Sequence, residues 1–276
     1  MRISLHGLAA RHPSAGAGSA PALKPLSLEI SQGEQVAVVG PSGAGKTTLL
    51  HALACALMPA AGRFSLDGVD PWTLSVAKLQ KLRGRLFLAP QAPPLPPRQR
   101  VITALLAARL PQQTLVASLR SLFYPVEIPA AEAALAQFDL AGKIWERVDR
   151  LSGGERQRVG LARALVSAAS LWLVDEPLSS LDPSRAAQAV DTLTSIARER
   201  NVTLVVTLHQ VDVATRFPRV LGMREGVLQF DLPSQEVTSE HLAVLYAQQE
   251  HELLGPPPNS EDPAAAGPRA AAMYCR

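Results

Sequence analysis

The stretch QVAVVGPSGAGKT, residues 35–47, decides the fold of this chain of 276 residues. Its aliphatic first part, residues 35–40, predicts a buried strand, and the glycine-rich part leads into a helix predicted from about Gly45 to Leu57. Residues 40–47 have the spacing GxxxxGK[ST], which is typical of a phosphate-binding loop between a strand and a helix. Glycines let backbone N–H groups curl around phosphates, and the helix start adds its positive dipole end.

Two side chains of this loop are predicted to act on a nucleoside triphosphate and its Mg²⁺ ion. Lys46 is expected to reach the β- and γ-phosphates, and Thr47 to give its hydroxyl to Mg²⁺. A plain glycine-rich turn is the alternative, but the strand before the loop and the helix after it favour a phosphate site. The predicted nucleotide-binding residues of this segment are Gly40, Pro41, Ser42, Gly43, Ala44, Gly45, Lys46, Thr47 and Thr48.

Outward from the loop, short apolar runs alternate with helical patterns, which indicates an α/β fold with a mostly parallel sheet. Residues from about 91 to 165 are first proline-rich and then alanine-rich, which predicts a helical subdomain inserted in the α/β core. The proline- and alanine-rich residues 251–276 are expected to be a disordered tail after a domain of residues 1–250. A strand and turn are predicted at residues 63–68, and further strands at residues 85–90, 171–176 and 201–209. A hairpin is predicted at residues 219–230, with its turn at Glu225 and Gly226.

Composition narrows the class of protein. Hydrophobic residues make up 47% of the chain and charged residues 18%, which suits a globular protein with a substantial core. The net charge of +3 is too small to indicate nucleic acid as a partner. Cys55 and Cys275 form neither a disulfide framework nor a metal cluster, so a reducing cytosol is expected. No apolar run approaches the roughly 18 residues of a membrane span, so any membrane role is expected to be that of a peripheral subunit.

An aliphatic strand that ends in acids, LWLVDE, forms the second motif and ends in Asp175 and Glu176. The carboxyl ends of parallel strands share one edge of a sheet, so both acids are expected beside the phosphate-binding loop. Asp175 is predicted to hold Mg²⁺, and Glu176 to polarise the attacking water. A solvated strand end is the alternative, since acids are usually exposed.

The third motif is LSGGERQR, residues 151–158. Ser152 is predicted as a helix N-cap, and Gly153 and Gly154 expose backbone N–H groups at the helix start, which makes a second anion site in the same chain. An ordinary capped helix is the alternative. Together with the phosphate-binding loop and the acid-ended strand, however, this string resembles the signature sequence of ATP-binding-cassette (ABC) ATPases, over about residues 1–232.

This resemblance implies roles for four more residues and an antiparallel β portion near the N-terminus. Gln91 corresponds to the family's Q-loop glutamine, which contacts Mg²⁺ and the coupling region. Asp182, with Ser180 and Leu181, resembles the D-loop that crosses to a partner subunit. His209 resembles the switch histidine at the γ-phosphate and, with Glu176 and Gln91, completes the predicted catalytic set. His12 takes the place of the family's adenine-stacking aromatic residue; a solvated loop residue is the alternative.

The resemblance also implies an assembly. Two subunits would bury two ATP molecules head to tail, each held by the phosphate-binding loop of one subunit and by Ser152, Gly153 and Gly154 of the other. Loss of the γ-phosphate would open this sandwich. The implied partners are a second copy of the chain, integral membrane permease subunits and, indirectly, a periplasmic substrate-binding protein. The expected location is the cytoplasmic face of the inner membrane.

Two stretches narrow the transporter class. LHQVDVATRFPRVLGMREG, residues 208–226, and SLRSLFYP, residues 118–125, resemble segments of phosphonate importers, so we expect ATP hydrolysis that drives import of phosphonate or a related phosphorus oxyanion. Neither stretch is expected to touch the substrate. The alternatives are the ATPase of another importer or exporter, a soluble ABC protein of translation or DNA repair, a small-molecule kinase, and a non-transport assembly subunit.

Overall fold

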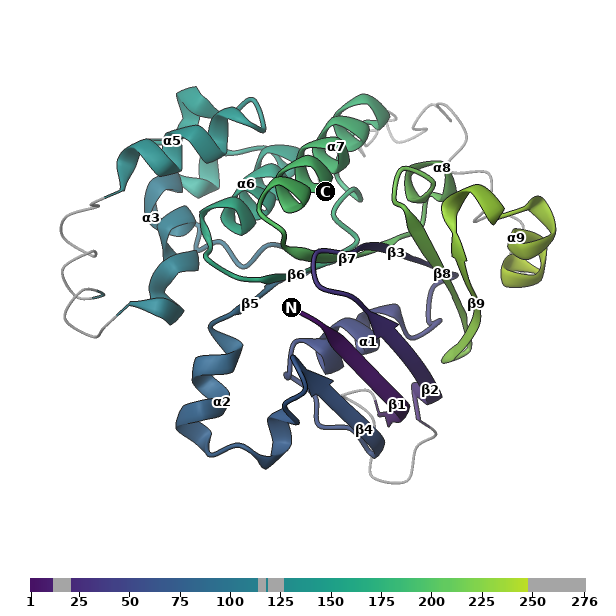
Figure 1. Cartoon of the computed structure of the whole chain (residues 1–276). Coiled ribbons are helices and arrows are strands. Elements are labelled where there is room, and N and C mark those ends of the chain that lie inside the picture. Colours follow the sequence, from purple (N-terminus) through teal and green to yellow (C-terminus); the bar gives the residue numbers. More distant parts are fainter. Residues whose placement is uncertain (12–20, 114–117, 119–126, 248–276) are drawn as a thin grey trace, which may run out of the picture.

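The computed structural model of the chain describes residues 1–11, 21–113, 118 and 127–247, and places them in two sheets with helices on both faces of the larger one (Figure 1). The larger sheet has six strands in the order β5-β6-β7-β3-β8-β9. All neighbours in it are parallel except β8 and β9, which form an antiparallel hairpin. The smaller sheet is antiparallel, in the order β2-β1-β4. The predicted α/β class, with a mostly parallel sheet and an antiparallel portion, is confirmed.

The strands are β1 (Ile3–Ala10), β2 (Leu23–Ile30), β3 (Gln35–Val39), β4 (Ala61–Leu66), β5 (Leu86–Ala89), β6 (Leu171–Asp175), β7 (Thr203–Leu208), β8 (Arg219–Arg224) and β9 (Val227–Pro233). The α-helices are α1 (Lys46–Leu53), α2 (Val76–Arg83), α3 (Val101–Leu106), α5 (Ile128–Ala136), α6 (Gly153–Val166), α7 (Pro183–Glu199), α8 (Val211–Ala214) and α9 (Ser239–Tyr246). Short 3₁₀ helices lie at Pro71–Thr73, Ala107–Gln112, Ala141–Lys143, Val148–Arg150 and Ser234–Glu236.

Alternation along the central strands divides the core into two layers. In β6, Leu171 and Leu173 belong to the buried cluster shared with α1 and the antiparallel sheet. Trp172 and Val174 point to the other face and join the cluster of α3, α5, α6 and α7. Continuous apolar strands of this kind are typical of parallel sheets that are covered on both sides.

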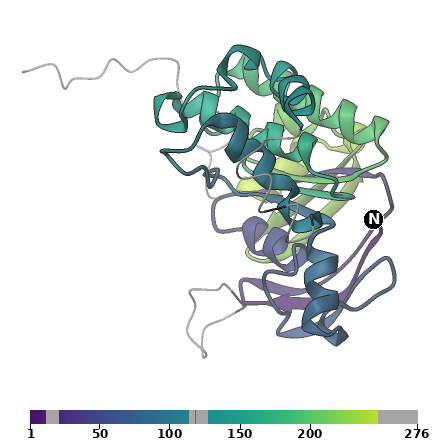
Figure 2. The same cartoon turned by 90° about the vertical axis from the view of Figure 1, so that its left-hand side faces the viewer.

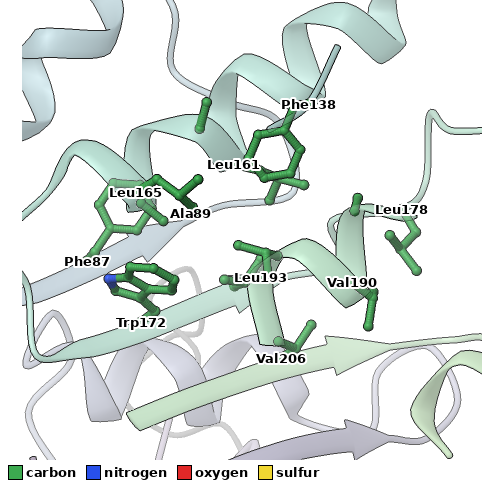
Figure 3. Close-up of a cluster of buried hydrophobic side chains, with 14 of the residues drawn as sticks. Phe87, Ala89, Phe138, Leu161, Leu165, Trp172, Leu178, Val190, Leu193 and Val206 are labelled. Atoms are coloured by element: carbon green, nitrogen blue, oxygen red, sulfur yellow. The ribbon is translucent and has the colours of Figure 1, made fainter. Parts of the chain in front are cut away.

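Trp172 anchors helix α6 on the central sheet. Its indole is fully buried and lies among Phe87 of β5 and Leu161 and Leu165 of α6 (Figure 3). Burial of a large aromatic side chain contributes on the order of 2–3 kcal/mol. Because α6 begins directly after Ser152, this packing also fixes where the LSGG segment lies.

Helices α3 and α5 pack on α6 within the region expected to form the helical subdomain. Figure 2 shows these teal helices and the purple strands of the antiparallel sheet at opposite ends of the molecule, with the central sheet between them. Residues 119–125 of the segment SLRSLFYP and the expected tail 251–276 lie outside the described residues.

Two predicted boundaries are wrong, for a backbone reason. The first helix was expected from Gly45 to Leu57, but it spans Lys46–Leu53, because Gly45 (φ 97°) and Cys55 (φ 54°) are both left-handed. The strand expected at residues 201–209 spans Thr203–Leu208, because Asn201 (φ 52°) still belongs to the turn that ends α7. By contrast, the hairpin turns at Glu225 and Gly226, as predicted.

Candidate active site

The loop of residues 40–45 connects strand β3 to helix α1 and is closely packed on its backbone side. Gly40 has φ 153°, and a Cβ on it would lie 2.0 Å from the carbonyl oxygen of Met223 in β8. Gly45 has φ 97°, and a Cβ there would lie 2.8 Å from the carbonyl oxygen of Ala22. Only glycine fits at either position, so the loop can follow a path in which its N–H groups face the cavity.

The β8–β9 hairpin supports this loop from behind. The N–H of Gly226, at the tip of the hairpin, donates a hydrogen bond of 3.0 Å to the carbonyl oxygen of Ala44. The carbonyl of Gly226 in turn accepts a hydrogen bond of 2.9 Å from the N–H of Lys24 in β2. The hairpin therefore joins the phosphate-binding loop to the antiparallel sheet.

Lys46, the first residue of α1, is held in place by its own loop. Its side chain is only 4% exposed, and Nζ donates hydrogen bonds to the carbonyl oxygens of Gly40 at 2.7 Å and Pro41 at 3.1 Å. Nζ also lies 3.7 Å from Oε1 of Glu176. A buried ammonium is costly unless it is paired, and these contacts keep its charge at the mouth of the loop.

Asp175 and Glu176 end strand β6 beside the loop. Asp175 is 6% exposed, and one of its oxygens, Oδ1, accepts a hydrogen bond of 2.6 Å from the hydroxyl of Thr207 in β7. Glu176 has a left-handed backbone, φ 43°, a conformation that costs a residue with a side chain roughly 1–2 kcal/mol. Its N–H donates to the same hydroxyl at 2.9 Å.

Glu176 contacts residues that follow two other strands of the central sheet. Its Oε1 lies 2.6 Å from Nε2 of His209, which follows β7, and 3.7 Å from Nζ of Lys46, which follows β3. The hydrogen bond with His209 is the main reason that the pKa of Glu176 is lower than its ordinary value; burial works in the opposite direction. Glu176 is therefore a carboxylate at neutral pH and can accept a hydrogen bond from a water molecule.

These groups open onto a cavity of about 460 Å³. It is lined by residues 42–48 together with Ala22, Gln91, Glu176 and His209. Gln91 follows β5 after one proline. Lining residues of the cavity therefore follow the carboxyl ends of four strands, β3, β5, β6 and β7. The structure thus brings together the phosphate-binding loop and the predicted catalytic residues. His12 lies outside the described residues.

The LSGG segment does not line this cavity. Ser152 caps α6 in a capping box: its Oγ accepts from the N–H of Glu155 at 3.2 Å, and its own N–H donates to Glu155 Oε2 at 2.8 Å. Ser152 and Gly153 are exposed. A Cβ on Gly154 would lie 3.0 Å from the carbonyl oxygen of Ser180 and 3.3 Å from Cδ2 of Leu181, so these two residues pack against this helix start.

Asp182 has a structural task of its own, because its side chain caps α7 by accepting a hydrogen bond of 3.0 Å from the N–H of Arg185. Thr207 is a functional candidate that sequence reasoning missed. The signal was a threonine within the aliphatic strand TLVVTL, at the position next to Asp175.

Oxygen donors near the cavity suit a hard cation. No group of three or more His, Cys, Asp or Glu side chains that could hold a metal occurs among the described residues. The residues available are the hydroxyl of Thr47 and the amide of Gln91, which line the cavity, and Asp175, whose Oδ1 is already engaged. Such a small set of oxygen ligands is what Mg²⁺ uses when a substrate phosphate completes its coordination.

The glycine-rich loop between a strand and a helix, with acids at the end of a neighbouring parallel strand, defines a P-loop nucleotide-binding protein. The model of the ABC transporter family matches residues 23–179. The chain belongs to the ABC transporter family, as the sequence predicted, and as a member it binds and hydrolyses ATP. This result excludes the small-molecule kinase.

Similar proteins extend the comparison over the whole chain. The chain is 61% identical to the phosphonates import ATP-binding protein PhnC 2 of Albidiferax ferrireducens, with 100% of both chains covered. It is equally identical, at 61% and over 100% of both chains, to the phosphonates import ATP-binding protein PhnC of a Polaromonas species. Among solved structures it resembles the dimeric ATP-binding cassette MJ0796 bound to ADP and Pi, with a TM-score of 0.73, 25% identity, and coverage of 85% of this chain and 100% of the other.

Proposed function

We propose that this chain is the ATP-hydrolysing subunit of an importer for phosphonates or related phosphorus oxyanions. The observation that carries the chemistry is the convergence of Lys46, Glu176 and His209 at one end of the cavity beside the loop. The substrate is supported by the two relatives with 61% identity over full length, both of which are named phosphonates import ATP-binding proteins.

In this proposal each group has one task in hydrolysis. Backbone N–H groups of residues 42–47 and the ammonium of Lys46 hold the β- and γ-phosphates and offset their charge. Glu176, whose ionised state His209 favours, accepts a hydrogen bond from the attacking water and orients it toward the γ-phosphate. His209 forms a hydrogen bond with Glu176 and lines the same cavity, from which it would also contact the γ-phosphate. Gln91 faces the same cavity from β5.

We also propose Mg²⁺ as the metal of the site, held by Thr47, Asp175 and Gln91. When bound, the ion would neutralise charge that develops on the phosphate oxygens. Thr47 and Gln91 supply their oxygens from the cavity wall. Asp175 supplies the buried carboxylate, which Thr207 orients.

A second copy of the chain completes the site in this proposal. Ser152, Gly153 and Gly154 lie outside the cavity and leave a capped, solvent-facing helix start, which is suited to an anion presented by another subunit. Ser180 and Leu181, which precede Asp182, lie against Gly154. The similar cassette MJ0796 is described as dimeric. His12 is proposed to stack on adenine.

The remaining partners follow from import. We propose that permease subunits dock near the exposed Gln91 and the prolines after it, at the cytoplasmic face of the membrane, and that a periplasmic binding protein delivers the substrate to them. No described helix has both the length and the apolar character that spanning a bilayer requires. Residues 1–250 are proposed to form the cassette, with a helical subdomain at about residues 91–165.

Growth on a phosphonate tests this proposal. A clean deletion strain without a second copy should fail to grow on a phosphonate as sole phosphorus source, and the wild-type gene but not Lys46→Ala should restore growth. Inorganic phosphate as the phosphorus source is the matched control. Normal growth of the deletion strain would refute the substrate. Failure to co-purify with a polytopic membrane protein would favour a non-transport assembly subunit.

A further inference from the structure

Thr207 contacts both acids at the end of β6, although its side chain does not line the cavity. It is fully buried in β7, and the parallel register with β6 places it next to Asp175. Its hydroxyl forms two hydrogen bonds: Oγ1 donates to Asp175 Oδ1 at 2.6 Å, and it accepts from the N–H of Glu176 at 2.9 Å. One hydroxyl therefore contacts both of the acids.

The donor and the acceptor in each of these two hydrogen bonds follow from the groups involved. A backbone N–H can only donate, so Oγ1 must accept from Glu176, and its single hydrogen is left for Asp175. Oδ1 of Asp175 is thus held by this hydrogen bond, which restricts rotation of the carboxyl group. This leaves Oδ2, and the second lone pair of Oδ1, as the possible ligands of a cation.

The second hydrogen bond acts on the backbone of Glu176. This residue follows strand β6 with a backbone φ of 43°, a conformation that residues other than glycine rarely adopt. The bond from its N–H to Thr207 holds the peptide group at the point where the chain turns. From that turn the side chain reaches Nε2 of His209 at 2.6 Å.

We propose that Thr207 is a positioning residue, whose hydroxyl sets the orientation of Asp175 toward the metal and the backbone turn that aims Glu176 at the water. The inference rests on the roles proposed above for the two acids. Valine has nearly the same shape as threonine but no hydroxyl. Thr207→Val would leave a buried N–H without its acceptor and a buried carboxylate without its donor, and both groups would turn elsewhere.

A matched control lies in the same strand. Thr203 is also fully buried in β7, and its hydroxyl also forms hydrogen bonds, to the carbonyl oxygen of Met1 at 2.6 Å and from the N–H of Gly33 at 3.0 Å. The two threonines are four positions apart, about 13 Å along a strand. Thr203→Val therefore removes the same group from the same strand at a distance from the site.

The experiment compares wild type, Thr207→Val, Thr207→Ser and Thr203→Val in the full chain. ATP hydrolysis is measured against ATP and Mg²⁺ concentration, ATP affinity is measured at equilibrium with Mg²⁺ and with EDTA, and thermal unfolding reports the fold. Thr207→Val should lower kcat, and weaken the Mg²⁺-dependent part of ATP binding, by about tenfold or more. Its ATP affinity in EDTA should stay at the wild-type value.

Two further results are expected if the hydroxyl acts by positioning. Thr207→Ser, which keeps the hydroxyl, should recover kcat and Mg²⁺ dependence to within about threefold of wild type. Thr203→Val should lose thermal stability but keep both. If Thr207→Val does not fold, Thr207→Ala takes its place, with the same expectation.

Three results would overturn the inference: wild-type kcat and Mg²⁺ dependence in a folded Thr207→Val protein, no recovery in Thr207→Ser, or an equal loss in Thr203→Val. The last would mean that loosening the strand is enough. A wild-type protein that neither binds nor hydrolyses ATP would instead refute the proposed function, so the two failures can be distinguished.

Discussion

Nε2 of His209 lies 2.6 Å from Oε1 of Glu176, and the two residues directly follow neighbouring parallel strands, β7 and β6. The side chain of Glu176 is only 14% exposed. Burial alone would raise the pKa of this carboxyl group, but the hydrogen bond from His209 outweighs burial, and the pKa is lowered. His209 therefore favours the ionised state of the proposed water-orienting group.

Removal of His209 should shift the acid limb of the pH profile of ATP hydrolysis to higher pH. In His209→Ala the largest cause of the lowered pKa is lost while burial remains, so the pKa of Glu176 rises. ATP hydrolysis should then fall off at higher pH than in wild type, in addition to a lower kcat. The measurement is kcat against pH, with His209→Gln as a control that keeps a hydrogen-bond donor.

The same pair predicts a pH-dependent stability difference. A carboxyl group whose pKa is lowered in the folded state stabilises the fold above its unfolded pKa, and this contribution disappears as pH falls through the folded pKa. Wild type should therefore exceed His209→Ala in unfolding free energy at neutral pH, and the gap should narrow in acid. Identical acid limbs and a constant stability gap would contradict the role given to His209.

Lys46 predicts a loss of binding without a loss of fold. Lys46→Ala should abolish most ATP binding and lower hydrolysis by about 100-fold or more, since the charge at the phosphates disappears. Lys46→Met is the matched variant, because it fills the buried space of the side chain and removes only the charge. Calorimetric ATP titration and a hydrolysis assay on the folded proteins measure the effect. Wild-type activity in either protein would refute the phosphate-binding role.

Gly226 predicts that damage to the hairpin reaches the nucleotide site. A Cβ on Gly226 (φ 76°) would lie 2.5 Å from the carbonyl oxygen of Ala22, whereas Gly68 (φ 79°) has open space around it. Gly68→Ala should cost only the left-handed strain, roughly 1–2 kcal/mol. Gly226→Ala should cost at least about 1 kcal/mol more and should weaken ATP binding, because its N–H supports Ala44. Denaturant unfolding and ATP titration measure both; equal effects of the two variants would show that the hairpin does not brace the loop.

The sequence predicted what depends on local pattern. The strand–loop–helix around Lys46, the acid-ended strand before Glu176 and the turn at Gly226 each carry a signal within a few residues. The structure contains each of them, although the helix after the loop is shorter than expected. The family resemblance added His209 and Gln91, which line the same cavity as the loop.

The features that sequence reasoning missed depend on register between distant segments. Thr207 becomes important only because β6 and β7 pair with Asp175 next to it. Likewise, the support of Ala44 by Gly226 requires that β8 lie beside β3. A pattern within one strand cannot show which residue of another strand it will face.

The last prediction concerns assembly. The phosphate-binding loop and Ser152 belong to the same chain, but Ser152 does not line the cavity of that loop. We consider the case in which Ser152 of one subunit completes the ATP site of another. The N–H groups of the phosphate-binding loop and those of the helix start at Ser152 then face each other, and no anion lies between them until ATP binds. MgATP should therefore bring two subunits together, and removal of ATP should separate them.

Two substitutions separate binding from hydrolysis in this assembly. Glu176→Gln keeps the shape of the side chain but loses the charge that orients the water, so it should bind ATP, hydrolyse it at least about 100-fold more slowly and accumulate as a dimer. Adding Ser152→Arg places a bulky side chain at the exposed start of α6 and should prevent the dimer while leaving ATP binding to the loop intact. Size-exclusion chromatography with light scattering, with and without MgATP, measures the outcome. A Glu176→Gln protein that is saturated with ATP yet monomeric at every concentration would mean that two copies of this chain do not form the sandwich on their own. Hydrolysis at the wild-type rate in the same protein would show that Glu176 does not orient the water.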